Sequence, residues 1–246
     1  MEYKRLLGFC PICDLKLEPH FPEFLYCPHC YSLYRIPTVK RWTAKEYWEL
    51  YGNRPQLQNE LDTDFLHYKR LADFTYLYER DEVFRGKELT TIYSYGGGFP
   101  KCESIIFKSK KIIVYDFIID FYKNNPLLDY FKEKFQPPEI EWREEIPESL
   151  VLQNDELLTA VHFLEHQEVE EMINLLNTIQ GKIFIYQPNP LTARSSDWLH
   201  FSPDHFSLLS PDAMSRLLKT LGFQILTQKP YSDDFYILAQ KGGKND

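Results

Sequence analysis

Two Cys-x-x-Cys pairs near the start of the chain constrain its folding most. Cys10 and Cys13 form the first pair, and Cys27 and Cys30 follow after thirteen intervening residues. Four thiolates at this spacing can close a tetrahedron around one metal ion. Zinc is favoured and iron is the alternative, because both ions accept four sulfur ligands in this geometry. Since four sulfurs leave no open coordination position, we expect a structural site rather than a catalytic one.

A bound metal gives the N-terminal segment a reason to fold. A segment of about 40 residues builds too small an apolar core to fold alone, so we predict a zinc ribbon over residues 1–42. This segment carries six Lys or Arg and four Asp or Glu. The two surplus positive charges are cancelled by a zinc ion with four thiolates. A neutral ribbon argues against RNA binding, and docking of a protein partner stays an alternative.

The composition of the chain is that of a globular protein. Of its 246 residues, 43% are hydrophobic and 26% are charged, and the net charge is −8. This charge disfavours a surface that coats nucleic acid. No apolar stretch approaches the roughly 20 residues that cross a bilayer, and the first residues do not resemble a signal peptide. We therefore expect a cytoplasmic protein with no membrane partner.

Strand and helix patterns alternate along most of the remaining chain. We expect strands over 89–95, 111–117, 139–142, 156–163, 182–190, 223–229 and 235–241. Helices are expected over 43–52, 58–85 as one longer helix or a helix pair, 101–109, 118–135 with a break at Pro126, 165–179 with an end at Gly181, and 211–221 after a Ser210 cap. Strands that alternate with helices predict a mostly parallel sheet covered on both faces, and the last two strands form an antiparallel hairpin. We divide the chain into the ribbon, a helical connector over 43–86 and an α/β domain over 87–246.

Three consecutive glycines follow the first strand of the α/β domain, and an acid ends the second. The glycines are Gly96, Gly97 and Gly98, and Asp116 comes 18 residues after the last of them. Glycines let the backbone approach a ligand, and a carboxylate at the second strand end accepts from ribose hydroxyls. Phe99 and Pro100 stand where a dinucleotide site needs a further glycine. The pattern therefore favours a nucleoside without phosphates over NAD.

The α/β domain resembles the class I S-adenosylmethionine-dependent methyltransferases. The resemblance is to the subgroup with an HxLEH motif after its fourth strand, which stands here as "HFLEH" at 162–166. The turn "YQPNP" at 186–190 and the segment "LHFSPDHFSLLSPDAMSRLLKTLGF" at 199–223 also match the subgroup. Over residues 87–241, the resemblance implies a Rossmann-like, seven-stranded sheet and methyl transfer from S-adenosylmethionine. The ribbon is similar in architecture to those of some deoxysugar C-methyltransferases and of a group of rRNA guanine methyltransferases.

The resemblance implies roles for individual residues. The cofactor-binding positions are Ser94, Gly96, Gly97, Gly98, Asp116, Phe117 and His162. The catalytic candidates are Glu165, His166, His200 and His205. The alternative for the last four is structural: Glu165 would cap the following helix, and the histidines would satisfy loop hydrogen bonds.

The prediction of the acceptor class rests on the net charge of the chain more than on any motif. A small molecule or carbohydrate is favoured over RNA by the acidic balance of the chain. Ser94 stands where the subgroup has an acid that orients the methionine moiety of the cofactor. This departure leaves a non-catalytic binding module, docked to a partner through the ribbon, as one alternative function, and an RNA methyltransferase is the other.

Overall fold

The computed structural model describes residues 8–20, 23–36, 46, 57–96, 98–116, 119–192 and 205–242. Four predictions therefore lie outside the described residues: the helix over 43–52 apart from Glu46, and the roles of Gly97, Phe117 and His200. None of the helices in the described ranges is long and apolar enough to cross a membrane.

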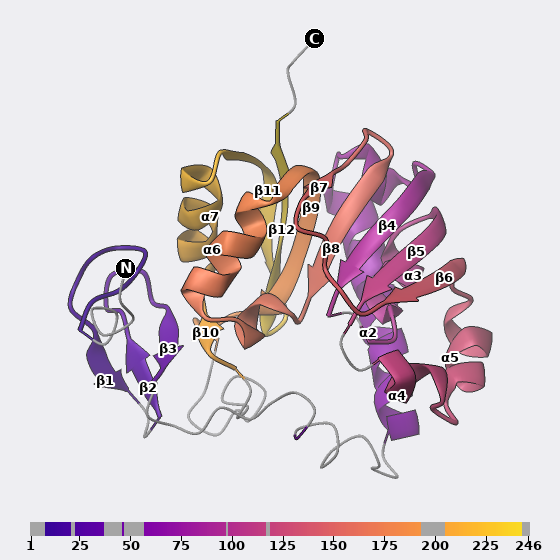
Figure 1. Cartoon of the computed structure of the whole chain (residues 1–246), viewed down its shortest axis with the longest axis horizontal. Coiled ribbons are helices and arrows are strands. Elements are labelled where there is room, and N and C mark those ends of the chain that lie inside the picture. Colours follow the sequence, from indigo (N-terminus) through magenta and orange to yellow (C-terminus); the bar gives the residue numbers. More distant parts are fainter. Residues whose placement is uncertain are drawn as a thin grey trace.

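The N-terminal segment folds as a small antiparallel sheet. Its strands are β1 (Glu18–His20), β2 (Phe24–Tyr26) and β3 (Leu33–Arg35). A fourth strand, β10 (Ser207–Leu208), pairs antiparallel with β3, so the order is β1-β2-β3-β10. Figure 1 shows this sheet beside the larger one, with β10 as its edge strand on the side of the larger sheet. The sequence did not predict that a segment near the C-terminus completes the ribbon.

The larger sheet confirms the predicted α/β fold. Its strands are β4 (Leu89–Tyr95), β5 (Ser109–Tyr115), β6 (Glu139–Arg143), β8 (Glu156–Val161), β9 (Ile179–Pro188), β11 (Phe223–Tyr231) and β12 (Asp234–Lys241). Within the described residues, these seven lie in the order β11-β12-β9-β8-β4-β5-β6, and a short β7 (Leu150–Val151) pairs with β9. The five strands from β9 to β6 are parallel, whereas β12 is antiparallel to both of its neighbours. The last two strands therefore form the expected hairpin.

Helices cover both faces of the larger sheet. They are α2 (Leu57–Tyr78), α3 (Lys101–Ile106), α4 (Ile119–Lys123), α5 (Leu128–Phe135), α6 (Val169–Asn177) and α7 (Pro211–Thr220), with short 3-10 turns η2 (Glu82–Arg85) and η3 (Leu164–His166). Tyr68 and Leu71 of α2 share one core with residues of α3 and the sheet. Met172 of α6 and Met214 of α7 share the other core with Cys30 and further ribbon residues. The ribbon thus packs with α6 and α7, on the side away from α2 (Figure 1).

The helix boundaries confirm some predictions and correct others. The helix predicted over 101–109 ends at Ile106, and Ser109 already lies in β5. As predicted, the helix over 118–135 is interrupted around Pro126, which separates α4 from α5. The Ser210 hydroxyl accepts from the Ala213 N–H and caps α7, also as predicted. The helix predicted over 165–179 is shorter. Glu168 begins it with a capping box, it ends at Asn177, and Gly181 lies inside β9 opposite Lys241.

Candidate functional site

The order of the parallel strands creates a switch point between β4 and β8. From β4 the chain moves to β5 and β6 on one side, and then returns to β8 on the other. Ligands of open α/β sheets bind outside the carboxyl ends of the strands at such a point. The glycine turn after β4, Asp116 after β5 and the "HFLEH" segment after β8 all lie at these ends.

The glycine turn requires glycine at two described positions. Gly96 and Gly98 have φ values of +61° and +48°, which favour glycine. A Cβ at Gly96 would lie 2.1 Å from Phe163 Cδ2, and one at Gly98 would lie 2.7 Å from the Tyr122 hydroxyl oxygen. Two aromatic side chains therefore press against the turn, which accounts for part of the glycine requirement without a ligand.

Asp116 stands beside this turn. Its side chain is buried, and the Gly98 N–H donates to its Oδ2 at 3.3 Å. A buried carboxylate at the end of β5 is the acceptor expected for ribose hydroxyls, and the Gly98 N–H holds it in place. The residues present thus fit the nucleoside end of S-adenosylmethionine.

Ser94, which was predicted to contact the cofactor, hydrogen-bonds to a buried acid of the protein. It is fully buried, and its hydroxyl donates to Oε1 of Glu103 in α3 at 2.8 Å. The Thr159 hydroxyl donates to the same oxygen at 2.7 Å. Burial raises the pKa of the Glu103 carboxyl, although both hydrogen bonds oppose this effect. The cofactor contact of Ser94 stays a prediction. Sequence reasoning missed Glu103, whose only signal was an acid in the short helix after the glycine turn.

His162 and Glu165 form a pair after β8. His162 has a φ of +48°, and its N–H donates to the Tyr186 carbonyl at 2.8 Å. Its Nδ1 lies 3.2 Å from Glu165 Oε1. Burial acts to raise the pKa of Glu165, but the His162 hydrogen bond and the charges of the nearby histidines lower it below its usual range. Burial acts to lower the pKa of His162, and Glu165 raises it. Both shifts favour an ion pair.

Glu165 is fully buried, and among the residues that the structure describes only one of its oxygens has a hydrogen-bond partner. Among the described residues, Oε2 makes no hydrogen bond. The alternative that Glu165 caps the following helix is wrong, because Glu168 occupies the cap position of α6. Its side chain instead lies beside His166 and His205.

His205 is brought to Glu165 by backbone contacts. The Phe206 N–H donates to the Glu165 carbonyl at 2.7 Å, and Arg35 Nε of the ribbon donates to the His205 carbonyl at 2.8 Å. The His166 and His205 ring centroids are 4.9 Å apart at 69°. One ligand atom from each of Glu165, His166 and His205 lies within 4.8 Å of the others. The structure therefore unites three of the four predicted catalytic residues.

A second polar group at the same strand ends was missed. His67 of α2 shares a hydrogen bond with the Tyr186 hydroxyl, with its Nε2 2.6 Å from the oxygen, and this hydroxyl donates to Asp234 at 2.7 Å. The Tyr186 ring also meets the His162 ring edge-on, with centroids 5.2 Å apart. These residues come from α2, β9 and β12, and no spacing in the sequence relates them.

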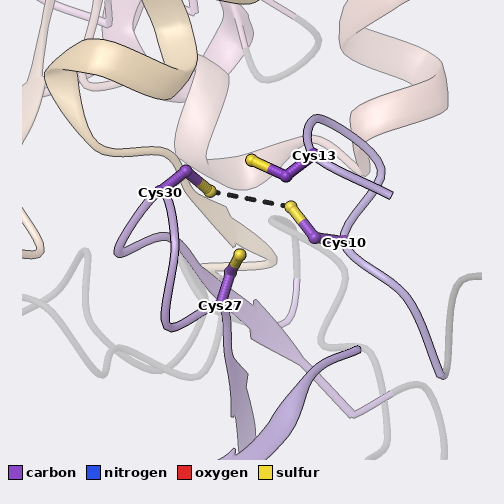
Figure 2. Close-up of side chains that lie close together, drawn as sticks. All are labelled: Cys10, Cys13, Cys27 and Cys30. Carbon is purple, nitrogen blue, oxygen red and sulfur yellow. Dashed lines mark hydrogen bonds between the residues drawn. The ribbon is translucent and has the colours of Figure 1, made fainter. Parts of the chain in front are cut away.

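The four ribbon cysteines converge as predicted. Figure 2 shows their sulfur atoms facing a common centre. Cys10 Sγ and Cys30 Sγ are 3.6 Å apart, and all four sulfurs lie within 4.8 Å of one another. A tetrahedron with Zn–S bonds of about 2.3 Å has edges of about 3.8 Å. None of the five cysteines, all in the described ranges, forms a disulfide. The donor set fits one tetrahedral zinc ion.

Comparison with known proteins places the fold. No protein family and no curated protein matches the sequence. Among solved structures, the mitomycin 7-O-methyltransferase MmcR aligns with a TM-score of 0.53 at 12% identity, over 80% of this chain and 60% of its own. An O-methyltransferase family 2 protein from Planctomyces limnophilus, in complex with apigenin, aligns with a TM-score of 0.53 at 11% identity, over 75% and 62%. The chain has a methyltransferase fold.

A third structure extends the comparison. An O-methyltransferase from neocarzinostatin biosynthesis, in complex with S-adenosylmethionine and 2-hydroxy-5-methyl naphthoic acid, aligns with a TM-score of 0.51 at 12% identity, over 79% of this chain and 61% of its own. The chain thus spans about three fifths of the length of these methyltransferases. The likeness is one of fold.

Proposed function

We propose that the chain is an S-adenosylmethionine-dependent methyltransferase of the HxLEH subgroup, acting on a small molecule or carbohydrate. The observation that carries the proposal is the buried Asp116 carboxylate beside the glycine turn, at the switch point of a methyltransferase fold. Asp116 would hold the ribose hydroxyls, and the backbone at Gly96 and Gly98 would face the methionine end. Gly97, Phe117, Ser94 and His162 stay predicted contacts of the same cofactor.

The residues after β8 would act on the acceptor. The cofactor supplies an electrophilic methyl group on sulfur, so the protein has to orient a nucleophile in line and remove its proton where it has one. Glu165, His166 and His205 form the cluster of titratable groups at the strand ends that suits this task. His162 would orient Glu165 through their hydrogen bond. His200 stays a predicted member of the group.

A small acceptor is supported by charge and by the similar structures. Two of those were solved with aromatic small molecules, apigenin and a naphthoic acid. The net charge of −8 counts against a polyanionic substrate such as RNA. We further propose a cytoplasmic location and a division into ribbon, helical connector and catalytic domain. RNA as acceptor and a protein partner of the ribbon are the alternatives.

Calorimetry with S-adenosylmethionine tests the cofactor assignment. We expect saturable binding by the wild type, a strong loss of affinity in Asp116→Ala, and no change in Asp129→Ala, which removes an exposed acid from α5. No heat of binding at millimolar cofactor would refute the enzyme. An affinity that is unchanged in Asp116→Ala would refute the ribose assignment. Binding without turnover on any acceptor class would favour the non-catalytic module.

A further inference from the structure

We infer that Glu165, His166 and His205 form a second metal centre, which binds one divalent transition-metal ion separate from the ribbon zinc. The metal site itself is inferred from the described geometry; only its role in catalysis rests on the proposed function. Two imidazoles and a carboxylate are a donor set that divalent transition metals prefer, whereas magnesium and calcium prefer oxygen ligands.

The unused oxygen of Glu165 is the first argument. The residue is fully buried, and Oε1 is occupied by His162, which leaves Oε2 without a hydrogen-bond partner in the described part of the chain. A buried carboxylate oxygen without a partner costs free energy, and natural structures rarely leave one. A cation held at this oxygen would remove the penalty.

The geometry of the histidines is the second argument. Their rings lie 4.9 Å apart, and one ligand atom of each is within 4.8 Å of a Glu165 oxygen. Ligands that share one ion are spaced in this way when metal–nitrogen and metal–oxygen bonds are about 2.0–2.2 Å. His166 is partly exposed, which leaves an approach for an ion, and His205 is buried.

The surroundings already hold the ligands in place. His162 donates to Glu165 from outside the cluster, which is the support that a ligating carboxylate commonly receives. The Phe206 N–H and Arg35 fix the backbone on which His205 stands. Such a cluster needs little rearrangement to accept an ion, unlike histidines on a free surface loop.

Three protein ligands leave coordination positions open. A closed four-ligand site is structural, whereas a site with three ligands can bind water or a substrate oxygen and lower its pKa. In the proposed reaction, an acceptor hydroxyl bound there would lose its proton to solvent, and its oxygen would form a bond to the methyl carbon. The carbon–sulfur bond would break with its electron pair going to sulfur. The inference therefore assigns oxygen, rather than carbon, as the methylated atom.

Cobalt(II) titration of the full chain tests the site without an activity assay. With the ribbon loaded with zinc, the wild type should bind one further equivalent of cobalt, with d–d absorption but no thiolate-to-cobalt charge-transfer band. Glu165→Gln, His166→Gln and His205→Gln should each lose this equivalent. His67→Gln, a histidine at the same strand ends outside the cluster, should keep it. His162→Ala should weaken binding about 10–100-fold, because it removes only outer support.

Several outcomes would overturn the inference. Wild-type protein that takes up no cobalt beyond the ribbon, or His166→Gln and His205→Gln variants that keep the full equivalent, would refute the site. Circular dichroism of each variant separates loss of the ligand from loss of the fold. Calorimetric binding of S-adenosylmethionine, measured on the same wild type, reports on the proposed function independently. If the chain binds S-adenosylmethionine but no further cobalt, the proposed function stands and the metal centre is refuted. If it binds a further cobalt but no S-adenosylmethionine, the metal centre stands and the proposed function is refuted.

Discussion

Replacing Arg35 with methionine should destabilise the contact between the ribbon and the His205 segment, which comes after β9 in the chain. The Arg35 side chain is 2% exposed; its Nε donates to the His205 carbonyl at 2.8 Å, and its Nη1 lies 2.7 Å from Glu23. A buried hydrogen bond from a charged donor contributes about 1.5–3 kcal/mol. The pair with half-exposed Glu23 adds about 0–1 kcal/mol, and the guanidinium over the Phe24 ring about 0.5–1 kcal/mol.

The sum for Arg35→Met is about 2–5 kcal/mol, with no further loss for the apolar stem of the side chain, because methionine replaces it. Urea unfolding of the zinc-loaded chain, followed by circular dichroism, measures the loss. The matched control is Arg143→Met, because Arg143 pairs with Glu141 at 2.6 Å but is 48% exposed, and we expect a loss below about 1 kcal/mol there. If both variants lose the same small amount, the ribbon does not anchor His205 through Arg35, and our reasoning is refuted.

Three further predictions concern other parts of the molecule. Because burial raises the pKa of Glu103 above its unfolded value, the wild type should lose stability relative to Glu103→Gln as the pH rises above about 4.5; a pH-independent difference in urea unfolding would contradict this. Gly96→Ala should cost about 2–4 kcal/mol in the same assay, from the positive φ and the overlap with Phe163. Truncating Phe163 to alanine should recover part of that cost, and additive losses in the double variant would rule the overlap out. Cys27→Ser should remove the ribbon metal and lower the melting temperature, whereas unchanged zinc in elemental analysis would argue against the tetrathiolate site.

Local signals predicted most of the α/β fold. Strands such as β4 and β5 contain runs of apolar or β-branched residues. A helix cap such as Ser210 is recognised by a hydroxyl that can accept from the first turn of the helix, followed by Pro211. The Cys-x-x-Cys pairs and the glycine turn with Asp116 were also predictable, because metal ligands and nucleoside-binding residues recur at characteristic spacings along a sequence.

Features that depend on distant segments were not predictable. Strand β10 has two residues and forms only because β3 offers it an edge. The Glu103 carboxyl and the His67–Tyr186 hydrogen bond join elements that pack together only in the finished fold. The helix end near Gly181 was misplaced because glycine is common after helices, whereas here it lies opposite Lys241 in a strand.

The pairing of β10 with β3 has a consequence for how the chain folds. The strands β1 to β3 are synthesised long before β10, and the Ser210 N–H that donates to Ser32 comes 178 residues after its acceptor. Contacts of such high sequence separation form slowly, because a long loop has to close before they are made. The N-terminal cysteines would therefore emerge, and could take up their metal, long before the structure they belong to is complete. A truncated chain that ends before β10 should hold zinc more loosely than the whole protein, since the ribbon sheet would lack its last strand.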